Sequence, residues 1–143
     1  MFTFQERVYD WLIRCFGPEI SAKLKERCYR FFEEATELVQ SLGLSREDCH
    51  ALIDYVYARP VGNHREEIGG TLVCLAALCS AIEEDMDECG DAELVRIELM
   101  MDKIRKKNAE KPFRDGPMPG FSNGTCHRCG RLKDVESGCD CLP

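Results

Sequence analysis

The chain has 143 residues, 44% of them hydrophobic, which is enough for one core and a small appendage and argues against two full domains. Its 26 acidic residues outnumber 19 basic ones, and the formal charge of -7 disfavours a nucleic-acid polymer as partner. Charges interrupt the N-terminal segment before it reaches signal-peptide length, and the longest uncharged run, 68–82, is shorter than the ~18 residues of a spanning helix. We therefore expect a cytoplasmic protein that has no membrane partner.

Hydrophobic spacing predicts helices along most of the chain and no strand, so the expected fold class is all-α. A capping box, in which Thr3 and Glu6 bond to each other's backbone, opens the first helix, and Ser45 opens the third. The predicted helices span about 3–17, 21–42, 45–59, 65–82 and 87–108. We expect a helical domain over 1–110, a linker rich in proline and glycine over 111–125, and a cysteine-rich tail over 126–143.

The fourth predicted helix is apolar on nearly all sides, which is unusual for a helix at the surface of a single small domain. Other helices or a second subunit must therefore cover it, and we expect an oligomer. Gly69 and Gly70 each disfavour a helix by ~1 kcal/mol relative to alanine, so they indicate close approach by a neighbouring helix or by a ligand.

Acidic residues gather on the second predicted helix, within "RFFEEATELVQ". At about 100° per residue, Glu33, Glu34 and Glu37 fall in one sector of that helix. If the second and fourth helices pack antiparallel, Glu34 and Glu37 face Glu67 and can supply oxygen ligands to Mg²⁺. The alternative is a solvated face on which Arg30 pairs with Glu34.

Cationic and aromatic side chains are candidates for contact with a nucleotide. The segment "KIRKKNAEK" concentrates positive charge that could meet a triphosphate, or that simply balances the dipole at a helix end. Its candidate residues are Lys103, Arg105, Lys106 and Lys107. Base recognition falls to Trp11 or Tyr55, although a single tryptophan at helical spacing is also typical of a core.

The two acidic motifs, "RFFEEATELVQSLGL" and "EEIGG", resemble the EExxE and ExxD signature of the MazG-like all-α nucleoside triphosphate pyrophosphohydrolases, in particular the short members encoded by phages and prophages. The likeness extends over about 2–120. It implies a helical bundle, a homodimer or homotetramer, and Mg²⁺-dependent hydrolysis of a ribo- or deoxyribonucleoside triphosphate to the monophosphate and pyrophosphate.

Residue by residue, the resemblance implies that Glu34, Glu37 and Glu67 hold Mg²⁺. It implies that Glu33 is a ligand of a second metal ion or the group that orients the attacking water. The chain departs from the pattern where the ExxD aspartate is expected, because Gly70 occupies that position.

Because of Gly70, one ligand oxygen is missing, and the expected replacements are Glu66, Asp54, Asp87 or water. If none of them replaces it, the site is weakened. The alternative function is therefore a catalytically impaired module that binds nucleotide or protein and acts through its C-terminal tail.

The C-terminal tail contains four closely spaced cysteines in the pattern CxxC followed by CxC, namely Cys126, Cys129, Cys139 and Cys141. Four thiolates can complete a tetrahedral Zn²⁺ site, and metal binding would order a tail that has few apolar residues. We expect a structural zinc knuckle, with a thiol-rich disordered tail or a redox pair as alternatives. The other six cysteines are expected to be free thiols within helices.

Overall fold

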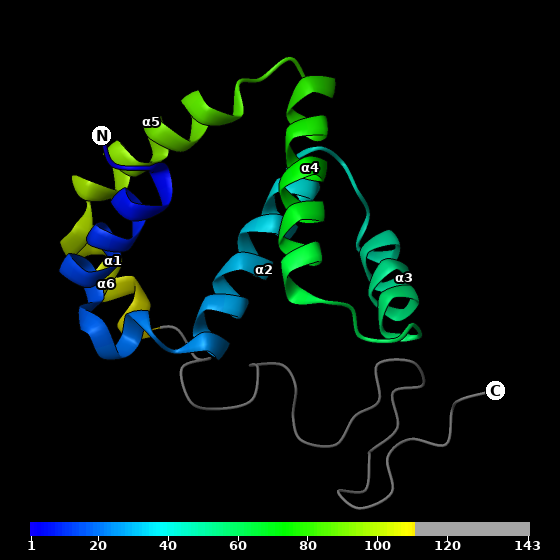
Figure 1. The fold of residues 1–143 in the computed structure, drawn as a ribbon, viewed down its shortest axis with the longest axis horizontal. Coiled ribbons are helices and arrows are strands. Elements are labelled where there is room, and N and C mark those ends of the chain that lie inside the picture. The colour runs from blue at the N-terminus through cyan, green and yellow to red at the C-terminus, as the bar shows by residue number, and fades with distance from the viewer. Residues whose placement is uncertain (111–143) are drawn as a thin grey trace, which may run out of the picture. The chain divides into compact units, whose positions relative to one another are not determined.

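The structure is a computed structural model that describes residues 1–110 (Figure 1). This part of the chain contains helices and no strand, so the all-α prediction is confirmed. The helices are α1 (Phe4–Ser21), α2 (Leu24–Ser41), α3 (Arg46–Tyr57), α4 (His64–Ala81), α5 (Met86–Glu98) and α6 (Met101–Glu110). Two compact units divide the chain, and the first, Met1–Asp102, holds α1 to α5.

Side chains cap the N-termini of four helices, as expected for short polar residues at these positions. Thr3 accepts a hydrogen bond from the backbone of Glu6, while the Glu6 carboxylate accepts one from the backbone of Thr3, so the predicted capping box is confirmed. Ser45 caps α3 as predicted. Asn63 and Asp85 cap α4 and α5 in the same way. These caps set where each helix begins.

Two helix ends differ from the predictions. The first helix continues past Gly17 to Ser21, with a kink where Gly17 adopts φ 77°, a conformation that glycine reaches without a side-chain clash. The predicted fifth helix is two helices, because the chain turns at Leu99 and Met100 and the Met100 amide donates to the Ile97 carbonyl over 3.2 Å. No glycine or proline marks this second break in the sequence.

The best-buried contacts lie between α1 and α5. Trp11 and Cys15 of α1 and Leu94 of α5 are the buried apolar residues of the described chain. Two ion pairs flank them: Arg7 lies 2.9 Å from Asp91, and Arg14 lies 2.7 Å from Glu98. The partners advance by the same two turns along each helix, which shows that α1 and α5 run parallel.

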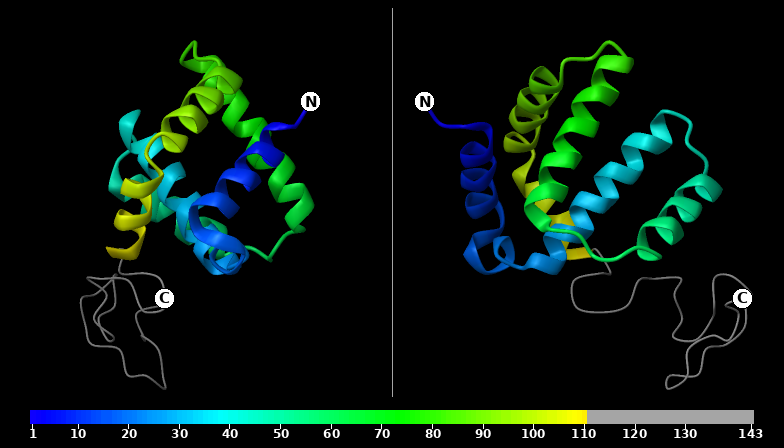
Figure 2. Two further views of the ribbon diagram at one scale, coloured as in Figure 1. Left: turned by 90° about the vertical axis from the view of Figure 1, so that its left-hand side faces the viewer. Right: turned by 45° about the vertical axis from the view of Figure 1, so that its right-hand side comes forward.

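The α2–α3–α4 segment follows an up-down-up path, so α2 and α4 point in the same direction and α3, which connects them along the chain, runs the opposite way (Figures 1 and 2). The antiparallel packing of these two helices considered from the sequence is therefore wrong. The connection through α3 decides this direction, because each of the two intervening turns reverses the chain.

Two further predictions concern membrane spans and thiols. Across residues 1–110, no helix combines the length and apolarity that crossing a membrane requires. The six cysteines of this part are free, as predicted. Cys15 is buried, as expected of a small apolar side chain, whereas Cys28, Cys74 and Cys89 are exposed.

Candidate functional site

The acidic face of α2 contains two kinds of carboxylate. Glu34 and Glu37 are exposed, and among the described residues no cation lies within ion-pair distance of either. Glu33 is half-buried and its carboxylate is bound by Arg30. The alternative pairing of Arg30 with Glu34 is therefore wrong, and the Glu34 and Glu37 side chains are accessible to a ligand.

Arg30 also contacts a second carboxylate, one turn earlier on α2. Its Nε atom lies 3.3 Å from Oε1 of Glu26, a carboxylate that is only 5% exposed. Arg30 thus lies between Glu26 and Glu33 on successive turns of α2. The position of the Glu33 carboxylate is restricted by this contact, while much of its charge is neutralised.

A cation on α5 lies near the acidic face. Arg96 donates hydrogen bonds of 2.6 Å to both carboxylate oxygens of Glu93. These hydrogen bonds and the charge of Glu93 raise the pKa of Arg96, and the Glu34 carboxylate raises it further. The sequence analysis did not identify Arg96, because nothing in its local pattern shows which helix it approaches.

Glu67 lies in the first turn of α4, next to Glu66. Carboxylates are favourable there because the N-terminal end of a helix carries partial positive charge. The Glu67 carboxylate extends back to the α3–α4 connection, where its Oε1 atom fills the space that a Cβ at Gly62 would occupy. Gly62 does not need a positive φ, so the requirement here is for space.

The predicted magnesium ligands are spread along α2 and the first turn of α4. Glu67 of α4 lines the same pocket as Phe31 of α2. Glu34 follows Phe31 by one turn and Glu37 follows by two, or ~9 Å at 1.5 Å per residue. In residues 1–110, no three His, Cys, Asp or Glu side chains form a group that could hold a metal ion.

The donor chemistry nevertheless suits a hard cation. Mg²⁺ commonly binds through one or two carboxylates, with water and substrate phosphates supplying the other oxygens. Glu34 on α2 and Glu67 on α4 are exposed carboxylates, and Glu67 lines the same pocket as Phe31, which precedes Glu34 by three residues. Two carboxylates suit a magnesium ion that binds together with a triphosphate better than they suit a magnesium ion that the protein binds alone.

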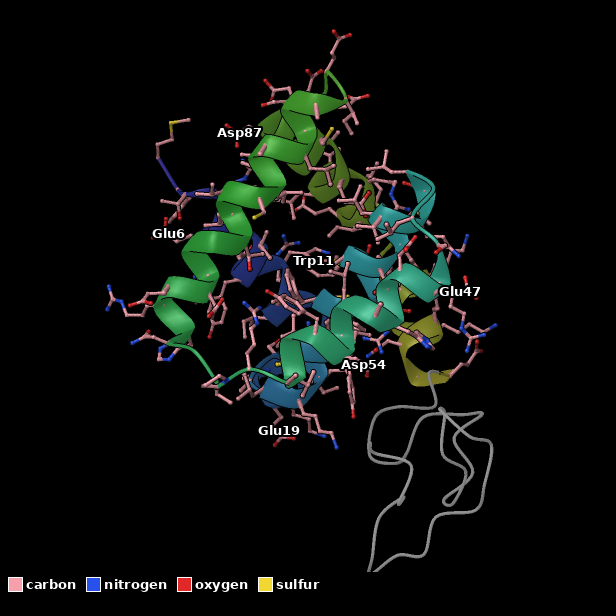
Figure 3. The ribbon with its side chains drawn as sticks, turned by 90° about the vertical axis from the view of Figure 1, so that its right-hand side faces the viewer. Glu6, Trp11, Glu19, Glu47, Asp54 and Asp87 are labelled. Carbon is pink, nitrogen blue, oxygen red and sulfur yellow. The ribbon has the colours of Figure 1, made fainter. Side chains whose placement is uncertain are left out.

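The position of the missing ExxD aspartate is open. A Cβ placed on Gly70 would meet no atom within 4 Å, so an aspartate would fit there without a clash. The candidate replacements Glu66, Asp54 and Asp87 are all exposed. Asp54 and Asp87 lie on opposite sides of the view in Figure 3, so they cannot both replace one ligand.

A pocket of about 1070 Å³ lies beside Glu67. It is bounded by α2, by the end of α3, by the connection that follows and by the first turns of α4. We call it the α3–α4 pocket. Its lining residues are Phe31, Val56, Tyr57, Arg59, Pro60, Val61, Gly62, His64, Glu67, Ile68, Thr71 and Leu72.

Neither proposed base-recognition residue lines the α3–α4 pocket. Trp11 is 8% exposed and packs edge-to-face against Phe16 at 5.7 Å between ring centroids, which agrees with the core alternative (Figure 3). Tyr55 carries the guanidinium of Arg59 at 4.5 Å from its ring centroid. The aromatic residues of the pocket are instead Phe31 and Tyr57.

The remaining predicted site residues belong to the second unit or lie beyond the described residues. Lys103, Arg105, Lys106 and Lys107 are exposed on α6 and belong to the second unit, whereas the carboxylates belong to the first. The proposed zinc ligands Cys126, Cys129, Cys139 and Cys141 lie outside the described residues, as does the 111–125 linker.

The pocket residues were missed because "YARPVGNH" was interpreted only as a turn between two helices. The signal was present: an aromatic residue, an arginine and a histidine surround a proline and a glycine within one short connection. A connection with this composition indicates a binding loop more strongly than a plain turn.

Protein-family models, curated proteins and solved structures were compared with the chain, and none of them matches it. The argument for function therefore depends on the acidic motifs and the geometry around them.

Proposed function

We propose that this protein is a Mg²⁺-dependent nucleoside triphosphate pyrophosphohydrolase, which converts a ribo- or deoxyribonucleoside triphosphate into the monophosphate and pyrophosphate. One observation carries the proposal. Glu67 of α4 and Phe31 of α2 line one pocket, and the exposed, unpaired Glu34 follows Phe31 by one turn. One carboxylate, Glu67, therefore lines a cavity large enough for a nucleoside, and a second, Glu34, lies one helical turn from a residue that lines it.

In this proposal Glu34 and Glu67 hold Mg²⁺, which neutralises charge on the triphosphate when it is bound. Glu37, one turn further along α2, binds through water or contacts a second ion. Glu33, held by Arg30, accepts a hydrogen bond from the attacking water. The water oxygen would bond to the α-phosphorus and release a proton to solvent, the bond from the α-phosphorus to the bridging oxygen would break, and pyrophosphate would leave with that oxygen.

The cationic residues have a supporting role in the proposal. Lys103, Arg105, Lys106 and Lys107 would bind phosphate oxygens, since phosphoryl transfer requires neutralisation of charge. Arg96 is an additional candidate for binding phosphate oxygens, because the charge of Glu34 contributes to its raised pKa.

We also propose that the active form is a homodimer or homotetramer. Ile68, Leu72 and Val73 of α4 are 59%, 55% and 70% exposed in the single chain. At about 100° per residue, Gly70 lies about 160° and Val73 about 140° around α4 from Ile68, on the side away from the pocket. Neither Gly69 nor Gly70 has an atom within 4 Å of an added Cβ, so a second copy can approach this side closely.

The C-terminal part of the proposal is a structural Zn²⁺ site formed by Cys126, Cys129, Cys139 and Cys141. The spacing of the four thiols in the sequence supports it, and their preference for Zn²⁺ over Mg²⁺ keeps the two metals separate. Zinc content of the purified protein, compared with that of Cys126→Ser, tests this site.

A second function has a specific observation in its favour. Within residues 1–110 no group of three potential metal ligands is formed, and Gly70 contributes no carboxylate. A module that binds a nucleotide or a protein without turnover, and acts through its zinc tail, would tolerate both features.

The deciding experiment offers a panel of ribo- and deoxyribonucleoside triphosphates, with and without Mg²⁺, and separates the products by chromatography. Glu34→Gln removes a proposed ligand, and Glu47→Gln, an equally exposed glutamate on α3, is the matched control. We expect monophosphate and pyrophosphate only with Mg²⁺, an at least ~100-fold loss for Glu34→Gln, and no loss for Glu47→Gln. A folded protein without turnover on any nucleotide would favour the binding module.

Gly70→Asp distinguishes a complete site from a degraded one. The added carboxylate has room, because nothing lies within 4 Å of an added Cβ. A large gain in turnover would show that the natural site lacks a ligand. Little change would show that another group already completes it.

A further inference from the structure

The lining of the α3–α4 pocket extends well beyond the two acidic motifs. Its walls are mainly apolar, with Phe31 and Tyr57 contributing aromatic rings that are 60% and 86% exposed. Exposed rings facing a shared hollow are available for stacking by a planar ligand. At about 1070 Å³ the space matches pockets for small molecules, which span ~300–1,000 Å³.

Polar groups converge on the same hollow. Arg59 and His64 bring cationic or hydrogen-bonding nitrogens, and Glu67 brings a carboxylate. A cation–π contact with Tyr55 stabilises the position of Arg59, whose guanidinium carbon lies 4.5 Å from the centroid of the Tyr55 ring. The pocket therefore offers aromatic faces together with groups that bind an anion, which is the complement of a nucleotide.

We infer that the α3–α4 pocket binds the nucleoside part of the substrate, with Phe31 and Tyr57 against the base and with Arg59 and His64 towards the phosphates. The inference rests on the proposed function for the identity of the substrate, and it moves base recognition away from Trp11 and Tyr55. Tyr57 and Arg59 become the residues that decide which nucleotides are accepted.

The position of the pocket supports this assignment. Phe31 and Glu34 are three residues apart on α2, so they lie on neighbouring turns of one face. Glu67 belongs both to the pocket wall and to the proposed magnesium ligands. A nucleotide with its base in the pocket thus has its phosphates beside the carboxylates.

A purely apolar occupant fits less well. An apolar helix of a second copy would remove Arg59, His64 and Glu67 from water without giving each a partner, and unpaired charges are strongly disfavoured in an interface. The opposite side of α4 carries Glu66 in its first turn, but Gly70, Val73 and Ala77 beyond it are uncharged. This side is therefore the better surface for a second copy.

The first test separates base binding from catalysis. The intact protein is titrated without metal with the common nucleosides, which have no phosphate, and amide chemical shifts are followed by NMR. We expect saturable shifts that include Tyr57, Val61 and Ile68. The absence of binding by every nucleoside would overturn the inference, whether or not the protein hydrolyses triphosphates.

The second test compares Tyr57→Ala with Tyr9→Ala, a tyrosine on α1 that is 61% exposed and does not line this pocket. Loss of one stacking ring should weaken nucleoside binding by ~10-fold. KM for the hydrolysed triphosphate should rise by a similar factor with kcat little changed, and affinity for Mg²⁺–tripolyphosphate should stay the same. Equal behaviour of the two variants would overturn the inference.

The third test concerns the anion. Arg59→Gln should weaken triphosphate binding by ~10-fold, as expected for loss of a charged hydrogen bond, while nucleoside binding is retained. Arg46→Gln, at the opposite end of α3, is the matched control. A Tyr57→Ala variant whose main defect is loss of assembly in sedimentation velocity would instead identify a second copy as the occupant and overturn the inference.

If wild-type protein binds nucleosides at the pocket but hydrolyses no triphosphate, the proposed hydrolysis fails while the pocket assignment stands. If it hydrolyses triphosphates while Tyr57→Ala and Tyr9→Ala behave alike, the pocket assignment fails and the proposed hydrolysis stands. The two proposals can therefore fail separately.

Discussion

The α1–α5 pair and the α2–α3–α4 segment use their apolar side chains in opposite ways. Between α1 and α5, Trp11, Cys15 and Leu94 are at most 8% exposed and two ion pairs flank them. Around the α3–α4 pocket, Phe31 and Tyr57 are at least 60% exposed. The first region provides stability, and the second keeps apolar surface available for a ligand or a partner.

This contrast shows that hydrophobic spacing on a helix does not tell which surface will cover it. Both regions have amphipathic helices, yet within the single chain only α1 and α5 bury apolar side chains against each other. An exposed aromatic surface lined with charges indicates function more strongly than a buried one does. The predictions below test whether stability and function can be separated along this division.

The largest expected effect on stability is at Trp11. Trp11→Ala removes the largest side chain among the buried apolar residues and should lower the free energy of unfolding by ~3–5 kcal/mol. Tyr57→Ala, in the exposed region, should change it by less than ~0.5 kcal/mol. Urea unfolding followed by far-ultraviolet circular dichroism measures both, and similar losses would contradict the division.

The next effect concerns assembly. Val73→Arg places a charge on the exposed side of α4 opposite the pocket, and an unpaired charge in an interface is unfavourable by ~3–5 kcal/mol. We expect dissociation in sedimentation velocity with helix content unchanged. Leu99→Arg, at the exposed position that follows α5, is the control that should leave assembly intact. A monomeric wild type would remove the basis for this prediction.

A smaller effect is expected where the α3–α4 connection meets Glu67. In Gly62→Ala the new methyl group occupies the space of the Glu67 carboxylate, which must move. Activity should fall by ~10-fold, as when a group that orients a metal ligand is changed, and the Mg²⁺ concentration for half-maximal activity should rise.

Gly69→Ala is the matched control, because an added Cβ there meets nothing within 4 Å. It should stabilise α4 by ~0.5–1 kcal/mol, since alanine favours a helix. Equal losses in the two variants would show that Gly62 acts only through folding.

The smallest effect concerns the start of α1. Hydrogen bonds from the backbone and then the side chain of Thr3 lower the pKa of Glu6 below its ordinary 4.5. A carboxyl group with a lowered pKa in the folded state stabilises the fold above its ordinary pKa, and this contribution is lost as pH falls through the lowered value. Glu6→Gln should therefore make stability less dependent on pH below ~5, a difference that unfolding at several pH values measures.

Particular residues show how far sequence reasoning reached. Thr3, Glu6 and Ser45 identified two helix starts correctly, because a cap depends on residues three positions apart and on nothing distant. The break after Glu98 was missed, since Leu99 and Met100 carry no local signal for a turn.

The sequence predicted which residues belong to the candidate site better than it predicted how those residues are arranged. Helical spacing put Glu33, Glu34 and Glu37 on one face, which the structure contains as a band on α2. Spacing could not show that Arg30 binds Glu33 rather than Glu34, or that Arg96 approaches from α5. Those outcomes depend on rotamers and on the position of another helix.

The sequence by itself determined the helices, their caps and the acidic face, because these depend on interactions within about one turn of a helix. Only the tertiary structure decided that α2 and α4 run parallel, that Trp11 is buried, and that Phe31, Tyr57 and Glu67 share a pocket. The reason is physical: contacts between distant residues depend on the connections and on competition among several apolar faces for one core.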